Sequence, residues 1–376
     1  MITLILISLF LLLHYIIFLI KVSTGIKKAS ETFSNNPSDE FVSVIIPFRN
    51  EEDNILNSLK SISDQNYPKE KYEVIYIDDN SEDNSFNVLK NYSLPENIKI
   101  LKSPYSDKTR GHKKIALEYA IEKSKGEIIV TTDADCIHSK KWLSTLISCF
   151  DSQTAFVSGP VQFISNGRLF DQLQKIEFSS LILVGAGLIG IKKPIICNAA
   201  NLGFRKSVFN EVGGYDDNKK ISSGDDEFLM QKISRKTNYK INFCFDKNAI
   251  SYTKPNKTIN DFYQQRKRWA SKGFYYKELS IVIKLIFIFL FYLGIPFQII
   301  MGILFNNIFI VSAFISLTLK FLFEYKIVQK DCAKLWDRSP IKYFILAEII
   351  HIPYIIIAGL SGIFGNYKWK GRKLER

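Results

Sequence analysis

Cysteine, histidine and methionine are scarce in this chain of 376 residues, which has five, four and three of them respectively. The cysteines are Cys136, Cys149, Cys197, Cys244 and Cys332. Their spacing fits neither a metal-binding module nor a disulfide framework. We therefore expect reduced thiols, consistent with a cytoplasmic domain. Internal repeats and low-complexity tracts are also lacking, apart from a polar linker over residues 30–39.

Acidic residues are outnumbered, with 37 Asp and Glu against 50 Lys and Arg, so the net charge is +13. Such a surplus is compatible with nucleic-acid binding, but the middle of the chain has no basic stripe interleaved with aromatics. Many Lys and Arg residues instead flank apolar segments, where they would meet anionic headgroups. The charge therefore indicates a membrane, and no nucleic acid, as partner.

A long apolar run lies at the start of the chain. Residues 2–20 form a nearly unbroken apolar run that contains no Lys, Arg, Asp or Glu and has His14 as its one histidine, close to the ~20 residues that a membrane-spanning helix needs. A signal peptide is the alternative, but it would carry a positive segment before the run and a small-residue cleavage site after it. Basic residues instead follow the run, which places the next segment in the cytoplasm. We expect residues 1–24 to be an uncleaved membrane anchor.

Further apolar runs, over residues 279–323 and 341–364, predict about three membrane helices near the end of the chain. Four crossings in all would put the basic tail outside, against the positive-inside tendency. One segment is therefore expected to lie in the interface or to re-enter, and the stretch with Lys284 and Pro296 is the candidate. The predicted organisation is multi-pass in the cell membrane: an anchor (1–24), a cytoplasmic domain (40–276), a membrane region (277–365) and a basic tail (366–376).

Between residues 40 and 276, β-rich runs alternate with helical ones, as in a mostly parallel α/β sheet. We predict strands over 42–46, 73–77, 98–101 and 127–131, and helices over 55–64, 85–91 and 113–124. Ligands of such sheets bind beyond the carboxyl ends of the strands. Polar residues follow three of the four strands: Pro47 to Glu51, Asp78 to Ser81, and Asp133 to Asp135. Each is also typical of a helix cap or turn, but together they predict a binding site.

Asp133 and Asp135 are alternate residues after a buried strand, so their carboxylates can bracket one cation. Hard divalent cations such as Mg²⁺ take oxygen ligands and usually keep substrate phosphates in the shell. A cation there would help a diphosphate leaving group carry its charge. His138 is a weaker candidate ligand, and a loop role is its alternative.

The order of these motifs resembles that of family 2 glycosyltransferases, inverting enzymes with a GT-A nucleotide-binding fold, over most of residues 41–269. Residues 45–52, I-I-P-F-R-N-E-E, resemble the family's first strand and turn, and Asp78-Asp79 resembles the acidic pair that follows. Residues 110–117 are similar to the G-K-x-x-A-L segment, with His112 inserted before Lys113. The resemblance implies donor contacts from Pro47, Glu51, Asp79, Lys113 and Asp133, and a direct metal ligand, for Mg²⁺ or Mn²⁺, in Asp135.

The acceptor side resembles the same family. Residues 198–205 are similar to the segment under the acceptor site, with Ala199 where the family has Gly. Residues 223–229, S-G-D-D-E-F-L, resemble the E-D-x-x-L segment, with Asp225 in place of Glu. The resemblance makes Asp226 the catalytic base, which takes the proton from the acceptor hydroxyl. Its structural alternative is an N-cap for the following helix.

A Q-x-x-R-W signature, Gln265, Arg268 and Trp269, directly precedes the membrane region. An Arg can pair with a diphosphate, and a Trp face can stack on a sugar. The resemblance therefore implies Arg268 as a donor contact, and Gln265 and Trp269 as acceptor or product contacts. An interfacial basic-aromatic helix is the alternative. The signature is shared by polysaccharide synthases, such as cellulose and poly-N-acetylglucosamine synthases, and by ceramide glucosyltransferases.

The function that the resemblance implies is transfer of a sugar from a nucleotide-sugar donor, a UDP-sugar, to a lipid or lipid-linked acceptor at the cytoplasmic face. Processive polysaccharide synthesis is the alternative, but few membrane segments are present to line a channel. A non-catalytic scaffold is disfavoured because every acidic position that the mechanism needs is occupied.

Overall fold

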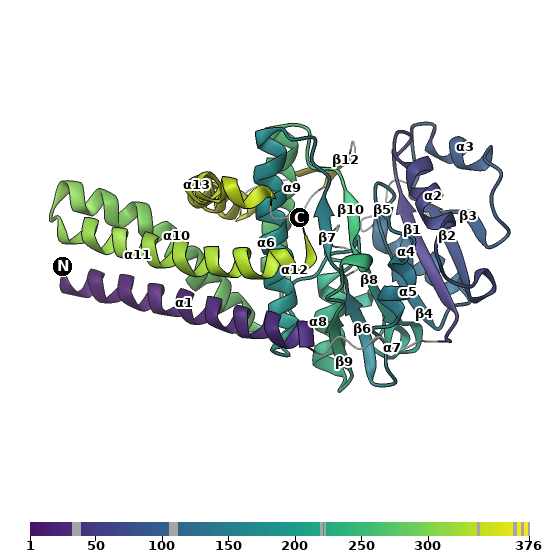
Figure 1. Ribbon diagram of the computed structural model, residues 1–376, viewed down its shortest axis with the longest axis horizontal. Helices are drawn as coiled ribbons and strands as arrows, with labels where there is room; N and C mark the ends of the chain where they lie inside the picture. The colour runs from purple at the N-terminus through teal and green to yellow at the C-terminus, as the bar shows by residue number, and fades with distance from the viewer. Residues whose placement is uncertain are drawn as a thin grey trace.

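The computed structural model describes residues 1–31, 39–104, 112–218, 221, 223–336, 339–363, 367–369 and 372–374. An α/β domain forms one end of the molecule, and long helices project from it in one direction (Figure 1). The N-terminus lies at the far end of these helices (Figure 1).

The main sheet has the order β3-β2-β1-β4-β8-β6-β9. Its strands are β1 (Val42–Phe48), β2 (Tyr72–Asp78), β3 (Ile98–Lys102), β4 (Ile128–Thr131), β6 (Thr154–Ser158), β8 (Leu202–Arg205) and β9 (Lys240–Phe243). The first four strands are parallel, β8 is antiparallel to both of its neighbours, and β9 is parallel to β6. A second sheet joins β5 (Ile137–His138), β10 (Ser251–Thr253) and β7 (Val161–Phe163), and β11 (Tyr367–Trp369) pairs with β12 (Arg372–Leu374). The prediction of an α/β fold is confirmed, with a mixed sheet.

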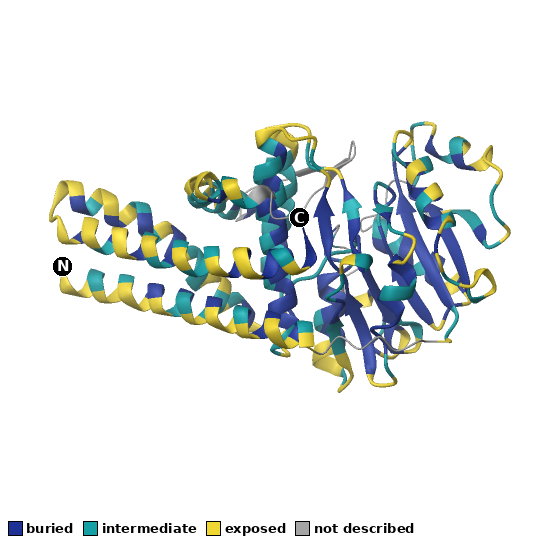
Figure 2. Cartoon of the chain, in the orientation of Figure 1, coloured by how far each residue is buried: buried dark blue, intermediate teal, exposed yellow. Residues whose placement is uncertain are grey.

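Helices cover both faces of the sheet. The helices of this domain are α2 (Ile55–Ser63), α3 (Ser85–Lys90), α4 (His112–Lys123), α5 (Trp142–Ile147), α6 (Leu169–Gly190), α7 (Lys206–Glu211), α8 (Glu227–Lys236) and α9 (Ile259–Ser271). Ile45 of β1 belongs to the hydrophobic core on the side of α4, and its neighbour Val44 to the core on the side of α2 and α5. Figure 2 shows the strands buried between these layers. The predicted strands and helices are confirmed at nearly their expected bounds.

Long apolar helices make up the rest of the chain: α1 (Ile2–Glu31), α10 (Leu279–Leu304), α11 (Ile308–Ile327) with the short α12 (Ala333–Leu335), and α13 (Phe344–Ile363). Within the described residues, five helices are long and apolar enough to cross a membrane, and α6 is the fifth. The outer surfaces of α1, α10 and α11 are exposed (Figure 2), and they carry large apolar side chains. By contrast, α6 is mostly buried between these helices and the sheet.

The helix that begins at the N-terminus continues beyond the predicted anchor. α1 runs to Glu31, and Val22 and Ile26 in its second half are fully buried. Its backbone touches that of α6, because a Cβ added to Gly25 would lie 1.8 Å from the Gly187 carbonyl oxygen. Only glycine permits two helices to approach so closely. The anchor and the α/β domain are therefore packed together, and are not joined only by a linker.

A buried ionic cluster joins three of the long helices. Lys320 of α11, only 1% exposed, pairs with Glu324 at 3.1 Å and with Glu348 of α13. The Tyr15 hydroxyl of α1 donates to Glu324 at 2.5 Å. Glu324, Glu348 and His351 are the described residues whose potential metal-ligating atoms converge, but Lys320 already bonds to both carboxylates. Because an unpaired buried charge costs several kcal/mol, each member constrains where the others can lie.

Candidate active site

The turns that follow β1 and β2 are tied together by buried polar groups. Asn50 and Asn80 have positive φ values of 52° and 56°, a conformation that Asn tolerates better than most residues. The buried Arg49 guanidinium donates to the backbone carbonyls of Asp79 and Asn80, and pairs with Glu82 at 2.6 Å. Asp79, one of the predicted donor-binding residues, is thereby held against the turn that follows β1.

The other residues of these turns are equally well fixed. Pro47 lies within β1, paired in register with Ile77. Glu51 is buried, its backbone N–H donates to the Ser85 hydroxyl at 2.7 Å, and its carboxylate accepts from the Asn54 amide. The predicted donor-binding residues Pro47, Glu51 and Asp79 therefore surround the carboxyl ends of β1 and β2.

Asp133 and Asp135 follow β4, and both side chains are partly exposed, whereas Ala134 between them is buried. The Asp135 carboxylate accepts hydrogen bonds from the Thr253 hydroxyl at 3.2 Å and from the Cys136 thiol. These two carboxylates are hard oxygen donors at a protein surface, where substrate phosphates and water can complete the shell of Mg²⁺ or Mn²⁺. The donor set fits the metal that the sequence predicts.

His138 does not share this surface. Its Nε2 lies 2.9 Å from the Thr132 hydroxyl and 3.2 Å from that of Ser251, and its ring packs 4.0 Å from the Trp142 ring. Burial lowers the pKa of His138 to about 3, so the imidazole is neutral. His138 lies in strand β5 and not in a loop, and its surroundings support a structural role.

Lys113, in the first turn of α4, bridges two parts of the site. Its Nζ lies 2.9 Å from Asp133 Oδ1 and 3.2 Å from Asp225 Oδ2. Burial alone would lower the pKa of Lys113, but Asp133 and Asp225 raise it above its ordinary value. Burial likewise opposes ionisation of Asp225, yet Lys113 and Lys114 bring the pKa of that carboxyl below its ordinary value. A fixed positive charge therefore sits beside the D-x-D carboxylates.

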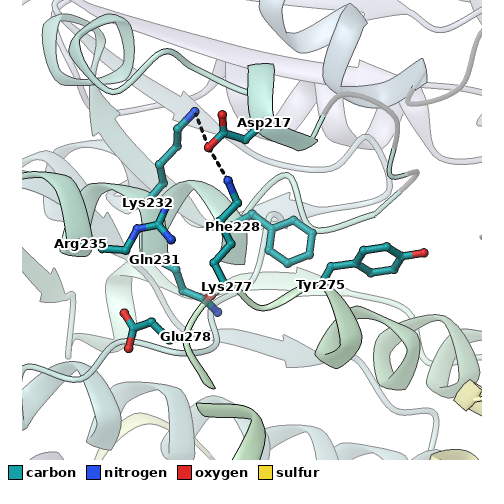
Figure 3. A pocket seen from close by; sticks show the side chains of 8 residues that line it. All are labelled: Asp217, Phe228, Gln231, Lys232, Arg235, Tyr275, Lys277 and Glu278. Carbon is teal, nitrogen blue, oxygen red and sulfur yellow. Dashed lines mark hydrogen bonds and ion pairs between the residues drawn. The ribbon is translucent and has the colours of Figure 1, made fainter. Parts of the chain in front are cut away.

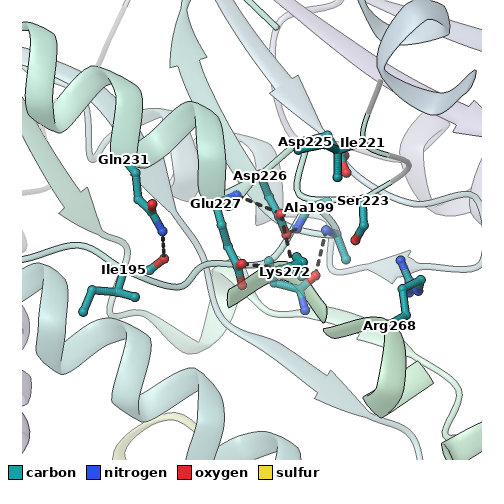
Figure 4. A network of polar contacts seen from close by, with 12 residues as sticks. Ile195, Ala199, Ile221, Ser223, Asp225, Asp226, Glu227, Gln231, Arg268 and Lys272 are labelled. Atoms are coloured by element: carbon teal, nitrogen blue, oxygen red, sulfur yellow. Dashed lines mark hydrogen bonds and ion pairs between the residues drawn. The ribbon is translucent and has the colours of Figure 1, made fainter. Parts of the chain in front are cut away.

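Asp226 begins α8 and faces the segment before β8 (Figure 4). Its Oδ1 accepts the backbone N–H of Glu227 at 2.8 Å, which makes it the N-cap of α8. Its Oδ2 accepts the backbone N–H of Ala199 at 3.0 Å. Both interpretations of Asp226 are thus compatible: the carboxylate caps the helix and lies beside the segment predicted to underlie the acceptor.

A buried lysine, which the sequence analysis overlooked, lies against this carboxylate. Lys272 Nζ is 3.8 Å from Asp226 Oδ1 and 3.1 Å from Glu227 Oε2, and the Tyr276 hydroxyl donates to the same Glu227 oxygen at 3.0 Å. Burial raises the pKa of Glu227 to about 7, although Lys272 opposes the shift. Burial opposes the charge of Lys272, but Asp226 and Glu227 raise the pKa of Lys272. The sequence signal that could have indicated Lys272 is its position about one helical turn after Trp269.

The Q-x-x-R-W residues divide between two surroundings on α9. The Gln265 side-chain oxygen accepts hydrogen bonds from Asn256 at 2.9 Å and from Arg266 at 2.6 Å. The Trp269 ring stacks on Phe178 of α6 at 5.8 Å, and the Arg266 guanidinium lies 4.2 Å from the same ring. Gln265 and Trp269 therefore face the junction with α6.

Arg268 has a different neighbourhood from these two residues. Figure 4 shows it at the edge of the network around Asp226 and Lys272. Its charge is close enough to lower the pKa of Lys272, against the carboxylates that raise it. The structure thus places Arg268 near Lys272, and its predicted contact with the donor stays a prediction.

A pocket with basic walls lies beside α8, near the start of α10 (Figure 3). Its lining residues are Asp217, Phe228, Gln231, Lys232, Arg235, Tyr275, Lys277 and Glu278. Asp217 pairs with Lys277 at 2.7 Å and with Lys232 at 3.8 Å. The lining contains none of the residues predicted for donor, acceptor or metal.

Comparison with known proteins shows what the domain is similar to. The sequence pattern described as Glycosyl transferase family 2 matches residues 43–213. Glycosyltransferase AglE of Haloferax volcanii is 30% identical over 213 residues, 55% of this chain and 65% of its own length. A Methanococcus voltae enzyme, named dolichyl N-acetyl-alpha-D-glucosaminyl phosphate 3-beta-D-2,3-diacetamido-2,3-dideoxy-beta-D-glucuronosyltransferase, is 25% identical over 59% of this chain and 67% of its own length. The chain thus spans about two thirds of these relatives.

A solved structure has the same fold over nearly the whole chain. The mannosyltransferase PcManGT from Pyrobaculum calidifontis, in complex with GDP-Man and Mn²⁺, superposes with a TM-score of 0.60 at 18% identity. The match covers 96% of this chain and 99% of the other. Residues 43–213 therefore resemble glycosyl transferase family 2 in sequence, and the mixed sheet has the GT-A fold.

Proposed function

We propose that this chain, with its glycosyl transferase family 2 domain, is an inverting glycosyltransferase that moves one sugar from a nucleoside diphosphate donor to a lipid-linked hydroxyl at the cytoplasmic membrane face. The observation that carries the proposal is the environment of Asp226. Its carboxylate is oriented by two backbone N–H groups and a buried lysine, close to the Lys113 and Asp225 pair beside the D-x-D carboxylates.

Asp226 is the general base of the proposed reaction. The acceptor oxygen forms a bond to the anomeric carbon, the bond from that carbon to the diphosphate oxygen breaks, and Asp226 takes the hydroxyl proton. The hydrogen bonds from Ala199 and Glu227 hold the carboxylate in position before the acceptor arrives. Such pre-orientation of a base contributes to general base catalysis.

The donor occupies the edge formed by β1, β2 and β4. Glu51 and Asp79 hold the nucleoside, while Lys113 and Arg268 meet the diphosphate, whose charge pairs well with Lys and Arg. Asp135 would be the direct ligand of Mg²⁺ or Mn²⁺, and Asp133 would contact the donor. When bound, the cation supplies Lewis-acid stabilisation of the departing diphosphate.

The acceptor is assigned to the lipid-linked class because of the long apolar helices. The exposed surfaces of α1, α10 and α11 carry large apolar side chains, as transmembrane helices do. The name of the Methanococcus voltae relative describes a dolichyl-linked acceptor, which supports the same class for this chain. Gln265 and Trp269 on α9 are assigned to the acceptor or product.

The test is a donor screen on the protein in nanodiscs. UDP- and GDP-sugars are offered with Mg²⁺ or Mn²⁺, released nucleoside diphosphate is measured, and lipid and aqueous extracts are analysed separately. A lipid carrying a single added sugar is the expected product. Long water-soluble chains would instead identify a processive synthase, and no release from any donor would contradict the enzymatic assignment.

A further inference from the structure

The last long helix, α13, is apolar enough to cross a membrane but has a different direction from the others. Figure 1 shows α13 end-on, whereas α1, α10 and α11 run lengthwise away from the α/β domain. α10, which holds Lys284 and Pro296 and was the expected interfacial segment, is one of the lengthwise helices. The orientations therefore make α13 the exceptional helix.

The contacts between α13 and α10 agree with this difference in direction. A Cβ added to Gly359 would lie 2.6 Å from the Phe289 ring, and the His351 ring lies 5.4 Å from that of Tyr292. Gly359 and His351 are about 12 Å apart along their helix, whereas Phe289 and Tyr292 are only about 4.5 Å apart along theirs. Two helices running side by side would show equal spacings along both helices. The unequal spacings therefore mean that α13 crosses α10 at a steep angle.

Both ends of α13 lie at the domain side of the long helices. At its start, the Phe344 ring packs 5.4 Å from those of Phe321 and Tyr325, in the last turns of α11. At its end, the Tyr263 hydroxyl of α9 donates to Ser361 at 2.7 Å. The following strand β11 also packs against α9. The chain thus returns to the α/β domain after α13, and does not emerge on the far side.

The two faces of α13 differ in chemistry. Glu348, its one acidic residue, points inward to Lys320, and Tyr354 donates to Glu177 of α6 at 3.1 Å. The outward face is entirely apolar, with Ile345, Ile349 and Ile357 exposed by 64%, 65% and 53%. An in-plane helix with one apolar face is suited to the boundary between headgroups and acyl chains.

We infer that α13 lies in the plane of the membrane, with this outward face in the headgroup–acyl boundary on the catalytic side, and that the chain crosses the bilayer three times, through α1, α10 and α11. The inference rests on the proposed membrane placement. Three crossings put the basic tail on the same side as the catalytic domain, which satisfies the positive-inside tendency that four crossings violate. The anionic headgroups of that leaflet complement the basic tail.

The position of α13 also ties the bilayer to the active site. Tyr354 holds Glu177, Glu177 pairs with Arg266, and Arg266 bonds to Gln265 of the Q-x-x-R-W signature. If α13 rests on the membrane, these contacts set the distance between the Q-x-x-R-W signature and the lipid surface.

The test measures depth in the bilayer, residue by residue. A genetically encoded fluorescent side chain is installed singly at Ile345, Ile349 or Ile357, and quenching is recorded in nanodiscs whose lipids carry nitroxides at different depths. Equal, shallow depths at all three positions are expected. Matched positions on α10, Ile286 and Ile303, are expected to differ in depth by most of the bilayer thickness.

A steady change of depth along α13, passing through the bilayer centre, would overturn the inference while leaving the membrane placement intact. Absence of quenching at the α10 positions would overturn both. A second measurement leaves every helix unaltered: an epitope tag after Arg376 is tested for protease access in sealed vesicles. Access from the same side as the catalytic domain is expected, and access from the opposite side would establish a fourth crossing.

Discussion

Asp226 caps α8 and also lies where, in the proposed reaction, an acceptor hydroxyl would be deprotonated. Asn is as good an N-cap as Asp, so Asp226→Asn keeps the helix while removing the base. We expect product formation to fall by a factor of about 10² to 10⁴, the usual contribution of a general base, with donor affinity unchanged. Product assays and donor titrations measure the two quantities separately. Asp217→Asn, in the neighbouring pocket, is the matched control, and full activity of Asp226→Asn would remove the mechanism.

Asp135 provides a test of the metal site at the same scale. Asp135→Ala removes the one direct protein ligand that we assign, so we expect loss of metal binding and of tight nucleotide binding. Calorimetric titration of the nucleoside diphosphate, with and without Mn²⁺, measures this loss. The control is Asp64→Ala, because the Asp64 pair with Lys140 is at the surface, where ion pairs contribute little. Mn²⁺-dependent binding that survives in Asp135→Ala would exclude the assignment.

Lys272 controls the charge around the base. Burial raises the pKa of Glu227 to about 7, and Lys272 holds it from rising further. In Lys272→Met, Glu227 loses the cation that opposes the rise of its pKa, so the pKa of Glu227 should rise further and the acid limb of the pH–activity profile should move to higher pH. Lys272→Arg keeps the charge and should shift the limb less. A profile that does not move in Lys272→Met would show that Lys272 supports only the fold.

At the scale of elements, α1 and α6 approach each other closely where Gly25 meets Gly187. The added methyl group of Gly25→Ala would meet the Gly187 carbonyl at 1.8 Å, and such overpacking costs about 1–3 kcal/mol. In Gly294→Ala the new Cβ meets only the Gln298 amide, at 3.8 Å, so this control should keep or gain stability. Thermal unfolding in detergent compares the two variants. Equal midpoints would contradict the close contact.

At the scale of the whole molecule, α1 is part of the folded unit. Its first ten residues are at most partly buried, whereas residues such as Leu12, Leu19 and Val22 are buried. Deletion of residues 1–31 should therefore expose the α6 surface and produce aggregation, even in detergent. Deletion of residues 1–10 is the control and should leave a monodisperse protein. Light scattering after gel filtration distinguishes the two, and a monodisperse product of the longer deletion would mean that α1 is only an anchor.

The sequence by itself determined the strands, the turns after them and the order of the motifs. Val42–Phe48 and Tyr72–Asp78 are short apolar runs bounded by polar turns, and such signals are local. Carboxyl ends of parallel strands meet at one sheet edge, so Glu51, Asp79 and Asp133 could be assigned together before any coordinates.

Tertiary structure alone decided which apolar helix faces what. Hydropathy depends on composition, which is nearly the same for a helix buried in a protein, lying on a bilayer or crossing it. α6 therefore passed unnoticed inside the α/β domain, and the sequence singled out α10 as the exceptional helix, whereas α13 is the one with a different direction. The pairing of Lys272 with Asp226 and the contact of Gly25 with Gly187 likewise join segments far apart in the chain, and no local pattern specifies such contacts.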